Sequence, residues 1–223
     1  MLPARRLLDL QAAWLAPTRA RALRQVDIGR RRRVLDLGCG FGVVTEELQR
    51  RCGGTAIAFD VDKAAVRQAA DARVAGRAEQ LPFATGSLDL VFTQFSLLWM
   101  PPDAIGEAAR VLATDGVLVA IEPDYDGLIE WPEPAITRDL WLAALTRAGA
   151  EPRIGRQLPD RLNACGLQVT VELLNTLVEP SPARLDFLRD LPLTDLERAR
   201  LATTTPATVA HLPVFIVTAW RRH

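Results

Sequence analysis

The sequence predicts a doubly wound α/β fold, in which helices cover both faces of a mainly parallel sheet. Between residues 33 and 123, apolar runs of about five residues alternate with helix-like segments of about ten residues. The apolar runs are continuous, which is typical of strands that are buried on both faces of a parallel sheet. Parallel neighbours are joined by right-handed crossovers, so helices are expected on both faces.

The individual elements follow this alternation. Strands are predicted at 34–37, 55–60, 72–76, 88–95 and 116–123, with helices at 42–51, 63–72 and 103–113. Beyond residue 130 the pattern is looser and predicts helices at 135–148, 156–165 and 183–201, with strands at 167–178 and 214–220. Residues 1–30 are expected to form a helical cap in which Pro17 ends one helix and Thr18 caps the next.

Composition excludes several classes of function. Lys+Arg and Asp+Glu both number 27, so no net charge draws the chain to nucleic acid or to an anionic membrane. The three cysteines are scattered and form no CxxC, which indicates reduced thiols rather than a zinc site. No apolar run reaches the ~18 residues that a membrane span needs. We expect a cytoplasmic protein without a membrane or nucleic-acid partner.

The stretch DLGCGFG places glycines at positions 38, 40 and 42, directly after the first strand and after Asp36. Ligands of open α/β sheets bind where strands end and helices begin. The dinucleotide fingerprint GxGxxG is absent, because position 43 is valine, and the preceding acid suits an ammonium group better than a pyrophosphate. Asp60 ends the second strand, near the ~20-residue offset at which an acid reaches ribose hydroxyls. A ribose, a cation and an anion together point to S-adenosylmethionine.

Five motifs in order carry a family resemblance: VLDLGCGFG, AIAFD, RAEQLPF, SLDLVFTQFSLLWM and EAARVLATDGVLVAIEP. Over about residues 33–123 the chain resembles the class I S-adenosylmethionine-dependent methyltransferases, in the small-molecule branch that includes the quinone-biosynthesis C-methyltransferases. The resemblance implies a Rossmann-like seven-stranded sheet with an antiparallel last strand. It divides the chain into the cap at 1–30 and a methyltransferase domain at 31–223, with a substrate-covering insert near 124–212.

The resemblance also implies roles for residues by position. Asp36, Gly38, Gly40 and Gly42 would hold the methionine moiety of the cofactor. The remaining cofactor contacts would come from Asp60 on the ribose, Val61, Ala78 and Glu79 around the adenine, and Gln94 and Phe95 at the reactive end. One position departs from the family pattern, because Arg77 stands where an acid commonly accepts from the adenine amino group. Glu79 or a backbone carbonyl would replace that acid, or adenine selectivity would be weaker.

No decisive catalytic residue is evident. The segment 121–133 follows the fifth strand and offers acceptor-side candidates, Glu122, Asp124 and Tyr125, although its acids could equally cap the next helix. No metal is expected, because Thr93 and Gln94 do not supply the acid that a catechol-type site would need after the fourth strand.

The favoured hypothesis is in-line methyl transfer to a small organic acceptor at oxygen, nitrogen or carbon, by a monomer or homodimer. The alternative is a non-catalytic S-adenosylmethionine-binding partner or regulatory protein. A nicotinamide-dependent oxidoreductase is disfavoured by Val43 and by the lack of a Tyr-x-x-x-Lys motif.

Overall fold

Seven strands form one sheet in the computed structural model, which describes residues 3–174 and 183–221. Their order is β3-β2-β1-β4-β5-β9-β7. The bounds are β1 Arg33–Leu37, β2 Thr55–Asp60, β3 Arg73–Ala75, β4 Leu88–Gln94, β5 Leu112–Pro123, β7 Leu167–Leu173 and β9 Val214–Arg221. The first five strands pair in parallel, whereas β9, the last strand of the chain, is antiparallel to both β5 and β7. The predicted doubly wound sheet with an antiparallel last strand is confirmed.

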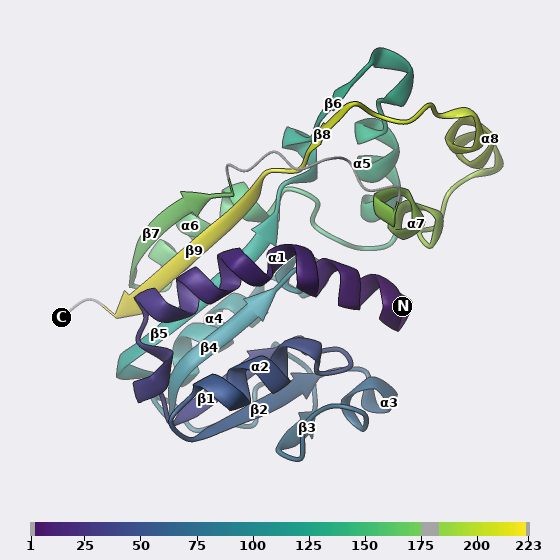
Figure 1. The fold of residues 1–223 in the computed structure, drawn as a ribbon. Coiled ribbons are helices and arrows are strands. Elements are labelled where there is room, and N and C mark those ends of the chain that lie inside the picture. Colours follow the sequence, from purple (N-terminus) through teal and green to yellow (C-terminus); the bar gives the residue numbers. More distant parts are fainter. Residues whose placement is uncertain (1–2, 175–182, 222–223) are drawn as a thin grey trace.

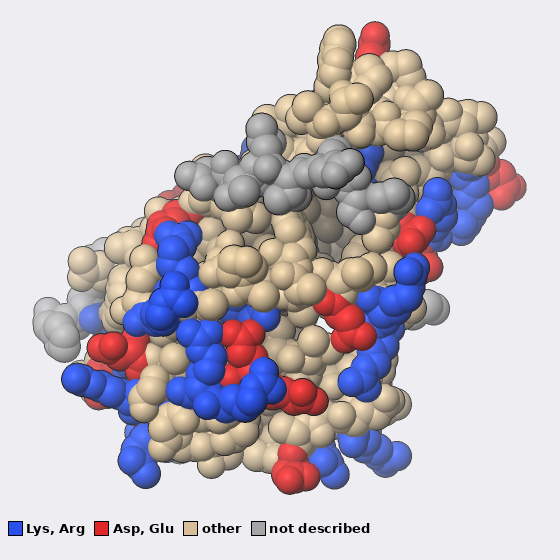
Figure 2. Space-filling view, in the orientation of Figure 1, with Lys and Arg blue, Asp and Glu red and all other residues tan. Residues whose placement is uncertain are grey.

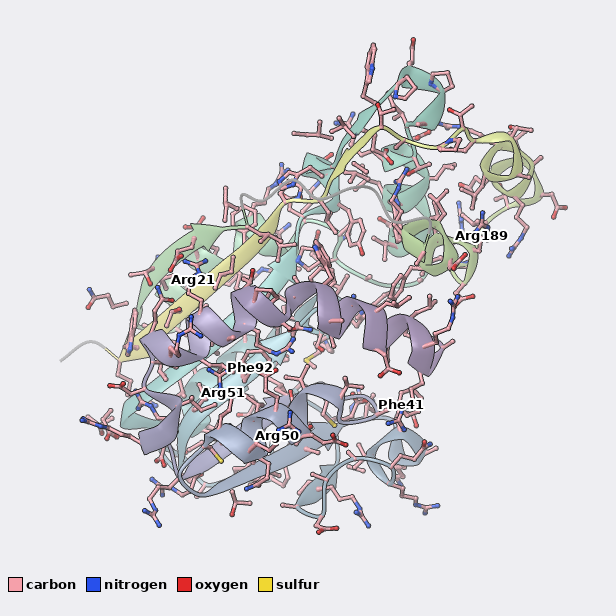
Figure 3. All side chains as sticks on the ribbon, in the orientation of Figure 1. Arg21, Phe41, Arg50, Arg51, Phe92 and Arg189 are labelled. Atoms are coloured by element: carbon pink, nitrogen blue, oxygen red, sulfur yellow. The ribbon has the colours of Figure 1, made fainter. Side chains whose placement is uncertain are left out.

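Helices cover both faces of this sheet. Figure 1 shows α1 and α2 in front of the strands and α4 and α6 behind them. These helices are α1 Arg5–Gln25, α2 Val43–Arg51, α4 Asp103–Val111 and α6 Ile154–Ala164. The strands between them are buried on both faces, and Phe59 and Phe92 are among the largest fully buried side chains. Phe92 lies in the sheet beneath α1 (Figure 3). Among the described residues, no helix combines the length and the apolar character needed to cross a membrane.

A lobe stands beyond the carboxyl ends of the parallel strands (Figure 1). It consists of the described residues between 124 and 212 that do not belong to α6 or β7. Its main elements are α5 Arg138–Arg147, α7 Ala183–Arg189, α8 Asp195–Thr203 and the two-stranded sheet of β6 Ile129–Trp131 and β8 Val209–His211. The buried carboxylate of Glu130 accepts hydrogen bonds from Thr137 Oγ1 and the Arg138 N–H, at 2.7 and 2.9 Å, and pairs with Arg184. One residue of β6 thus holds the starts of α5 and α7 together.

The expectation that Pro17 ends a helix is wrong, because α1 runs unbroken from Arg5 to Gln25 with Pro17 inside it. A proline within a helix removes one backbone hydrogen bond and costs ~3 kcal/mol. Packing offsets that cost, since Leu15 and Leu23 of this helix are fully buried and belong to the main core. Thr18 is accordingly a buried residue within the helix and not a cap.

Several other boundaries differ from the predictions. Helix α3, Lys63–Val66, is shorter than the predicted 63–72, although Asp62 caps it by accepting from the N–H groups of Ala64 and Ala65. The helix predicted at 183–201 is divided into α7 and α8. Strand β7 ends at Leu173, and residues 175–178 of the strand predicted there lie outside the described residues. Neither β6 nor β8 was predicted, because each has only three residues and lies outside the regular strand and helix alternation.

Candidate active site

A cavity of about 790 Å³ opens at the carboxyl ends of β1, β2 and β4. Sites for small molecules and cofactors typically measure ~300–1,000 Å³. One wall comes from the amino-terminal half of α1, through Leu8, Gln11 and Ala12. The opposite wall comes from the glycine loop, and α5 and α7 of the lobe close the far end. The cavity therefore lies at the strand ends where ligands of open α/β sheets bind.

The glycine loop needs its glycines for both backbone and packing reasons. Gly38 and Gly42 have φ angles of +80° and +79°, in the left-handed region that side chains disfavour. A Cβ on Gly38 would lie 2.5 Å from the Cβ of Ser96, whose Oγ donates to the Gly38 carbonyl oxygen at 2.9 Å. Gly38 and Gly40 line the cavity, whereas Gly42 is packed against Ala69 and is not among the lining residues.

Asp36 closes the inner end of this loop. Thr45 Oγ1, on α2, donates to its Oδ2 at 2.6 Å, and the side chain faces the cavity. Burial raises the pKa of Asp36 to about 7, although the Thr45 hydrogen bond and the charge of Arg19 oppose the shift. A cationic ligand group beside this carboxylate would lower its pKa again. Asp36 is therefore suited to an ammonium group.

Asp60 is held in place at the end of β2. Its Oδ2 accepts from the Gly40 N–H and its Oδ1 from the Asp62 N–H, each at 2.9 Å. Each carboxylate oxygen has a second lone pair, so Asp60 can accept two further hydrogen bonds from a ligand. Its neighbour Val61 is 66% exposed and also lines the cavity, which gives the ligand an apolar contact.

The next wall contains the departure from the family pattern. Arg77, Ala78 and Glu79 all line the cavity. Arg77 Nε donates to Glu79 Oε1 at 2.6 Å. A hydrogen bond from the Glu79 backbone, together with this ion pair, holds the pKa of Glu79 below its ordinary value. Glu79 could replace the acid that the family commonly has at position 77, but its carboxylate is already paired with Arg77.

Gln94 and Phe95 follow at the end of β4. Arg19 of α1 donates to Gln94 Oε1 at 2.9 Å and is almost fully buried. Phe95 has a φ of +52°, a strained backbone for a bulky residue, and Trp14 of α1 meets its ring edge-on with 6.1 Å between ring centroids. Helix α1 therefore fixes this end of the site directly.

Of the three acceptor-side candidates, only Tyr125 lines the cavity. Glu122 lies within β5 and turns away, so that its Oε1 accepts from the N–H groups of Ser96 and Leu97, each at 3.0 Å. Asp124 pairs with Arg156 of α6 and accepts from the Asp126 N–H. Tyr125 therefore remains an acceptor-side candidate, whereas Asp124 caps the short helix Tyr125–Gly127, which is the alternative that the sequence left open.

Glu122 remains unusual because it is completely buried. Its Oε2 has no hydrogen-bond partner in the described part of the chain. Burial raises its pKa to about 7, against the lowering effect of the backbone hydrogen bonds. This carboxyl holds the segment that connects β4 to the short helix Leu97–Trp99, and this segment carries Phe95 and Ser96.

Sequence reasoning missed most of the far end of the cavity. We name this part the aromatic compartment and define it by Met100, Tyr125, Trp141, Leu145, Phe187 and Leu191, all of which line the cavity. The rings of Tyr125 and Trp141 are stacked with 4.8 Å between centroids. The lone tyrosine and the apolar residues of 135–148 were visible in the sequence, but no local pattern indicated that they share a cavity with Phe187.

Comparison with known proteins gives a domain match over part of the chain. The protein-family profile described as "Methyltransferase domain" matches residues 35–120. The malonyl-[acyl-carrier protein] O-methyltransferase of Enterobacter lignolyticus is 27% identical over 77% of this chain and 69% of its own length. The biotin biosynthesis bifunctional protein BioHC of Cellvibrio japonicus is 39% identical over 39% of this chain. Human arginine-hydroxylase NDUFAF5 is 30% identical over 43% of this chain and 30% of its own length.

Solved structures agree on the fold. A Bacillus halodurans protein described as a candidate methyltransferase superposes with a TM-score of 0.67 at 15% identity, covering 91% of this chain and 98% of that one. The geranyl diphosphate C-methyltransferase of Streptomyces coelicolor, solved with Mg²⁺, geranyl diphosphate and S-adenosyl-L-homocysteine, superposes with a TM-score of 0.58 at 17% identity, over 91% and 77% of the two chains.

Residues 35–120 match a methyltransferase domain, and the fold is that of the solved methyltransferase structures, as the sequence resemblance predicted. The matched part covers 18% of BioHC, so that relative contains much that this chain does not align with.

Proposed function

We propose that this chain transfers the methyl group of S-adenosylmethionine to a small organic acceptor by in-line displacement. One observation carries the proposal. A single cavity joins the glycine loop and Asp60 to the aromatic compartment, with Gln94 and Phe95 also in its lining. In the sheet, β4 lies between β1, which precedes the glycine loop, and β5, which precedes Tyr125. The cofactor would occupy the side of β1 and β2, and the acceptor the side of β5 and α5.

The residues present fit this cofactor. Asp36 Oδ2 is bonded to Thr45, which leaves Oδ1 for the ammonium group of the methionine moiety. Asp60 is already oriented by two backbone N–H groups and retains lone pairs for the ribose hydroxyls. Val61 and Ala78 offer apolar contacts for the adenine.

The bound cofactor would supply an activated methyl group: the acceptor atom bonds to the methyl carbon, the carbon–sulfur bond breaks with its electron pair left on sulfur, and the acceptor proton passes to solvent. The chain itself has to align the acceptor and exclude water. Such positioning can contribute ~7–11 kcal/mol in well-oriented systems. Phe95 and the aromatic compartment provide apolar walls for this purpose.

General base catalysis contributes little in this proposal. No histidine lines the cavity among the described residues. Tyr125 is a poor base, because burial and the charge of Glu122 raise its pKa and keep its hydroxyl protonated. An acceptor hydroxyl would therefore pass its proton to solvent rather than to a strong base in the described lining.

The acceptors named for the relatives cannot be assigned directly to this chain. A malonyl group brings a carboxylate, and a diphosphate brings more negative charge. The described lining contains one cation, Arg77, which lies on the adenine wall and is paired with Glu79. The non-catalytic alternative is less well supported, because the cavity continues past Phe95 and is not filled by packed side chains.

We also propose that residues 1–30 and the insert near 124–212 act as covers for the two halves of the cavity in a cytoplasmic monomer or homodimer. Lining residues from α1, α5 and α7 support the cover roles. The three free cysteines are compatible with a reducing compartment.

Isothermal titration calorimetry with S-adenosylmethionine, S-adenosylhomocysteine and NAD tests the proposed cofactor. Micromolar binding of the first two is expected. It should be lost in Asp60→Ala and retained in the matched control Asp71→Ala, which changes an exposed aspartate. Binding of NAD alone, or of none of the three, would overturn the proposal.

A further inference from the structure

The side chains that line the aromatic compartment indicate which class of ligand it binds. Most of its wall is apolar, and three of its six defining residues are aromatic: Tyr125, Trp141 and Phe187. Trp141 and Leu145 are buried and come from α5, while Phe187 is half-buried and comes from α7. Aromatic side chains pack best against flat apolar partners, in stacked or edge-to-face geometry. These walls therefore favour a ligand with an aromatic body.

The Tyr125 hydroxyl is the polar group set into these walls. Its ring is stacked on Trp141 and only 9% of the residue is exposed. Within residues 3–174 and 183–221, this hydroxyl makes no hydrogen bond, although the residue lines the cavity. Among the described residues, Glu122 Oε2 is the one fully buried polar side-chain atom without a partner, so Tyr125 Oη is open to the cavity. A ligand oxygen can therefore accept a hydrogen bond from Tyr125 Oη in place of solvent.

Charge decides against an anionic ligand. The described cavity lining carries five acids and one cation, namely Asp36, Asp60, Asp62, Glu79 and Asp190 with Arg77. Arg77 follows β3, which is separated from β5 by β2, β1 and β4. The aromatic compartment lies on the side of β5, and the charged lining residue on that side is Asp190. Residues 175–182, NTLVEPSP, contain no arginine or lysine in their sequence. In Figure 2 the charged side chains gather over α1 and α2 and again over α7 and α8, while the rest of the lobe is largely free of them on this face.

The arginines near the cavity are already engaged elsewhere. Arg19 is bonded to Glu47, Gln94 and the Ala12 carbonyl oxygen, and it is not a lining residue. Arg6 pairs with Asp186 of α7, and Arg5 lies over the ring of Phe41, 6.0 Å from its centroid. Figure 3 shows Phe41 near the amino-terminal end of α1, below Arg189. A carboxylate in the aromatic compartment would therefore meet Asp190 and no described cation.

We propose that the acceptor of this chain is a neutral aromatic hydroxyl compound of the phenol class, whose oxygen accepts a hydrogen bond from Tyr125 Oη while its ring packs against Trp141 and Phe187. Carboxylate and phosphate acceptors are excluded by charge. The inference rests on the proposed methyltransferase function and deepens it by naming the acceptor class.

Matched probes test this assignment. The protein is first saturated with S-adenosylhomocysteine, and 2-naphthol and 2-naphthoate are then titrated at pH 7. The two probes share a ring system and differ in a neutral hydroxyl against a carboxylate. We expect 2-naphthol to bind at least about tenfold more tightly, because burying an unpaired charge is costly.

Two variants localise the effect. Tyr125→Phe should weaken 2-naphthol binding about three- to tenfold, the value of one hydrogen bond, while S-adenosylhomocysteine affinity is unchanged. Asp190→Asn should reduce the difference in affinity between 2-naphthol and 2-naphthoate. Trp131→Phe, at an exposed aromatic residue of β6, is the control and should change neither affinity.

The outcomes separate the two proposals. Failure to bind S-adenosylhomocysteine in the first titration would overturn the cofactor assignment itself. If the cofactor product binds, the acceptor assignment is overturned by equal or tighter binding of 2-naphthoate, by failure of both probes to bind, or by an unchanged 2-naphthol affinity in Tyr125→Phe.

Discussion

Glu122 Oε1 accepts a hydrogen bond from the backbone N–H of Ser96 at 3.0 Å, although neither residue belongs to a regular ladder contact between β4 and β5. The same oxygen accepts from the Leu97 N–H. Ser96 in turn donates to the carbonyl oxygen of Gly38 at 2.9 Å. One buried carboxyl is thereby linked to the glycine loop through the segment that follows β4.

Replacing Glu122 with alanine should strip two buried N–H groups of their partner. Each unsatisfied group costs ~1–3 kcal/mol, so the free energy of unfolding should fall by about 2–5 kcal/mol. Affinity for S-adenosylmethionine should also fall, because Ser96 would no longer be held against Gly38. Chemical denaturation and calorimetry measure the two effects. Glu46→Ala, on the exposed face of α2, is the control, and an equally small effect of both changes would contradict the account.

The stability of the ligand-free protein should depend on pH through Asp36 and Glu122. Burial raises the pKa of each carboxyl to about 7, above the ~4 of an unfolded chain. Between these values the folded chain holds more protons, so the free energy of unfolding falls as pH rises, by at most ~1.4 kcal/mol per pH unit for each group. Denaturation at pH 5 and pH 7.5 should show a smaller decline in Asp36→Asn and Glu122→Gln than in the unaltered protein. Parallel pH profiles would refute the assignment.

Arg19 should prove essential for docking α1. Its guanidinium is almost fully buried and pairs with Glu47 at 2.7 Å while donating to Gln94. In Arg19→Met, Glu47 keeps only its contact with Arg51, and Gln94 loses its orientation. We expect a loss of about 2–4 kcal/mol in the free energy of unfolding, since removing one partner of a buried pair is strongly destabilising. The same change at the exposed Arg24 should cost less than ~0.5 kcal/mol. Equal thermal shifts in the two variants would contradict this role.

Glu130 should hold the lobe together more firmly than the surface ion pairs do. Its side chain is fully buried and serves Thr137, Arg138 and Arg184 at once. Glu130→Ala should lower stability by ~3–5 kcal/mol, because it leaves a largely buried guanidinium unpaired. Arg6→Ala, which breaks the exposed Arg6–Asp186 pair, should cost less than ~1 kcal/mol. Thermal unfolding of both variants measures the two losses of stability. Similar losses in Glu130→Ala and Arg6→Ala would show that the buried pair has no special role.

The sequence predicted the features that depend on local pattern. The strand and helix alternation, the glycine turn after β1 and the acid that ends β2 follow from short-range rules of period and turn chemistry. Strands β1, β2 and β4 therefore lie where they were expected, whereas β5 begins at Leu112, ahead of the predicted 116–123. The positions of Asp36 and Asp60 at the cavity follow from the same rules, because both residues are tied to strand ends.

The features that escaped prediction depend on long-range packing. Helix α1 continues through Pro17 because distant core residues offset the local penalty. Glu122 turns inward because β5 places its side chain beside the Ser96 and Leu97 N–H groups, a contact between residues 26 and 25 positions apart. The aromatic compartment contains Tyr125, Trp141 and Phe187 from three separate elements. No single segment of the sequence indicates that these residues come together.

A crystal structure of the protein with S-adenosylhomocysteine would show directly whether one cavity holds both the cofactor and the acceptor. We expect density for the ligand in the cavity, with its ribose hydroxyls on Asp60, its amino-acid end against Gly38 and Asp36, and its sulfur facing Phe95 and the aromatic compartment. Density outside this cavity, or a ligand whose sulfur faces away from the aromatic compartment, would contradict this expectation.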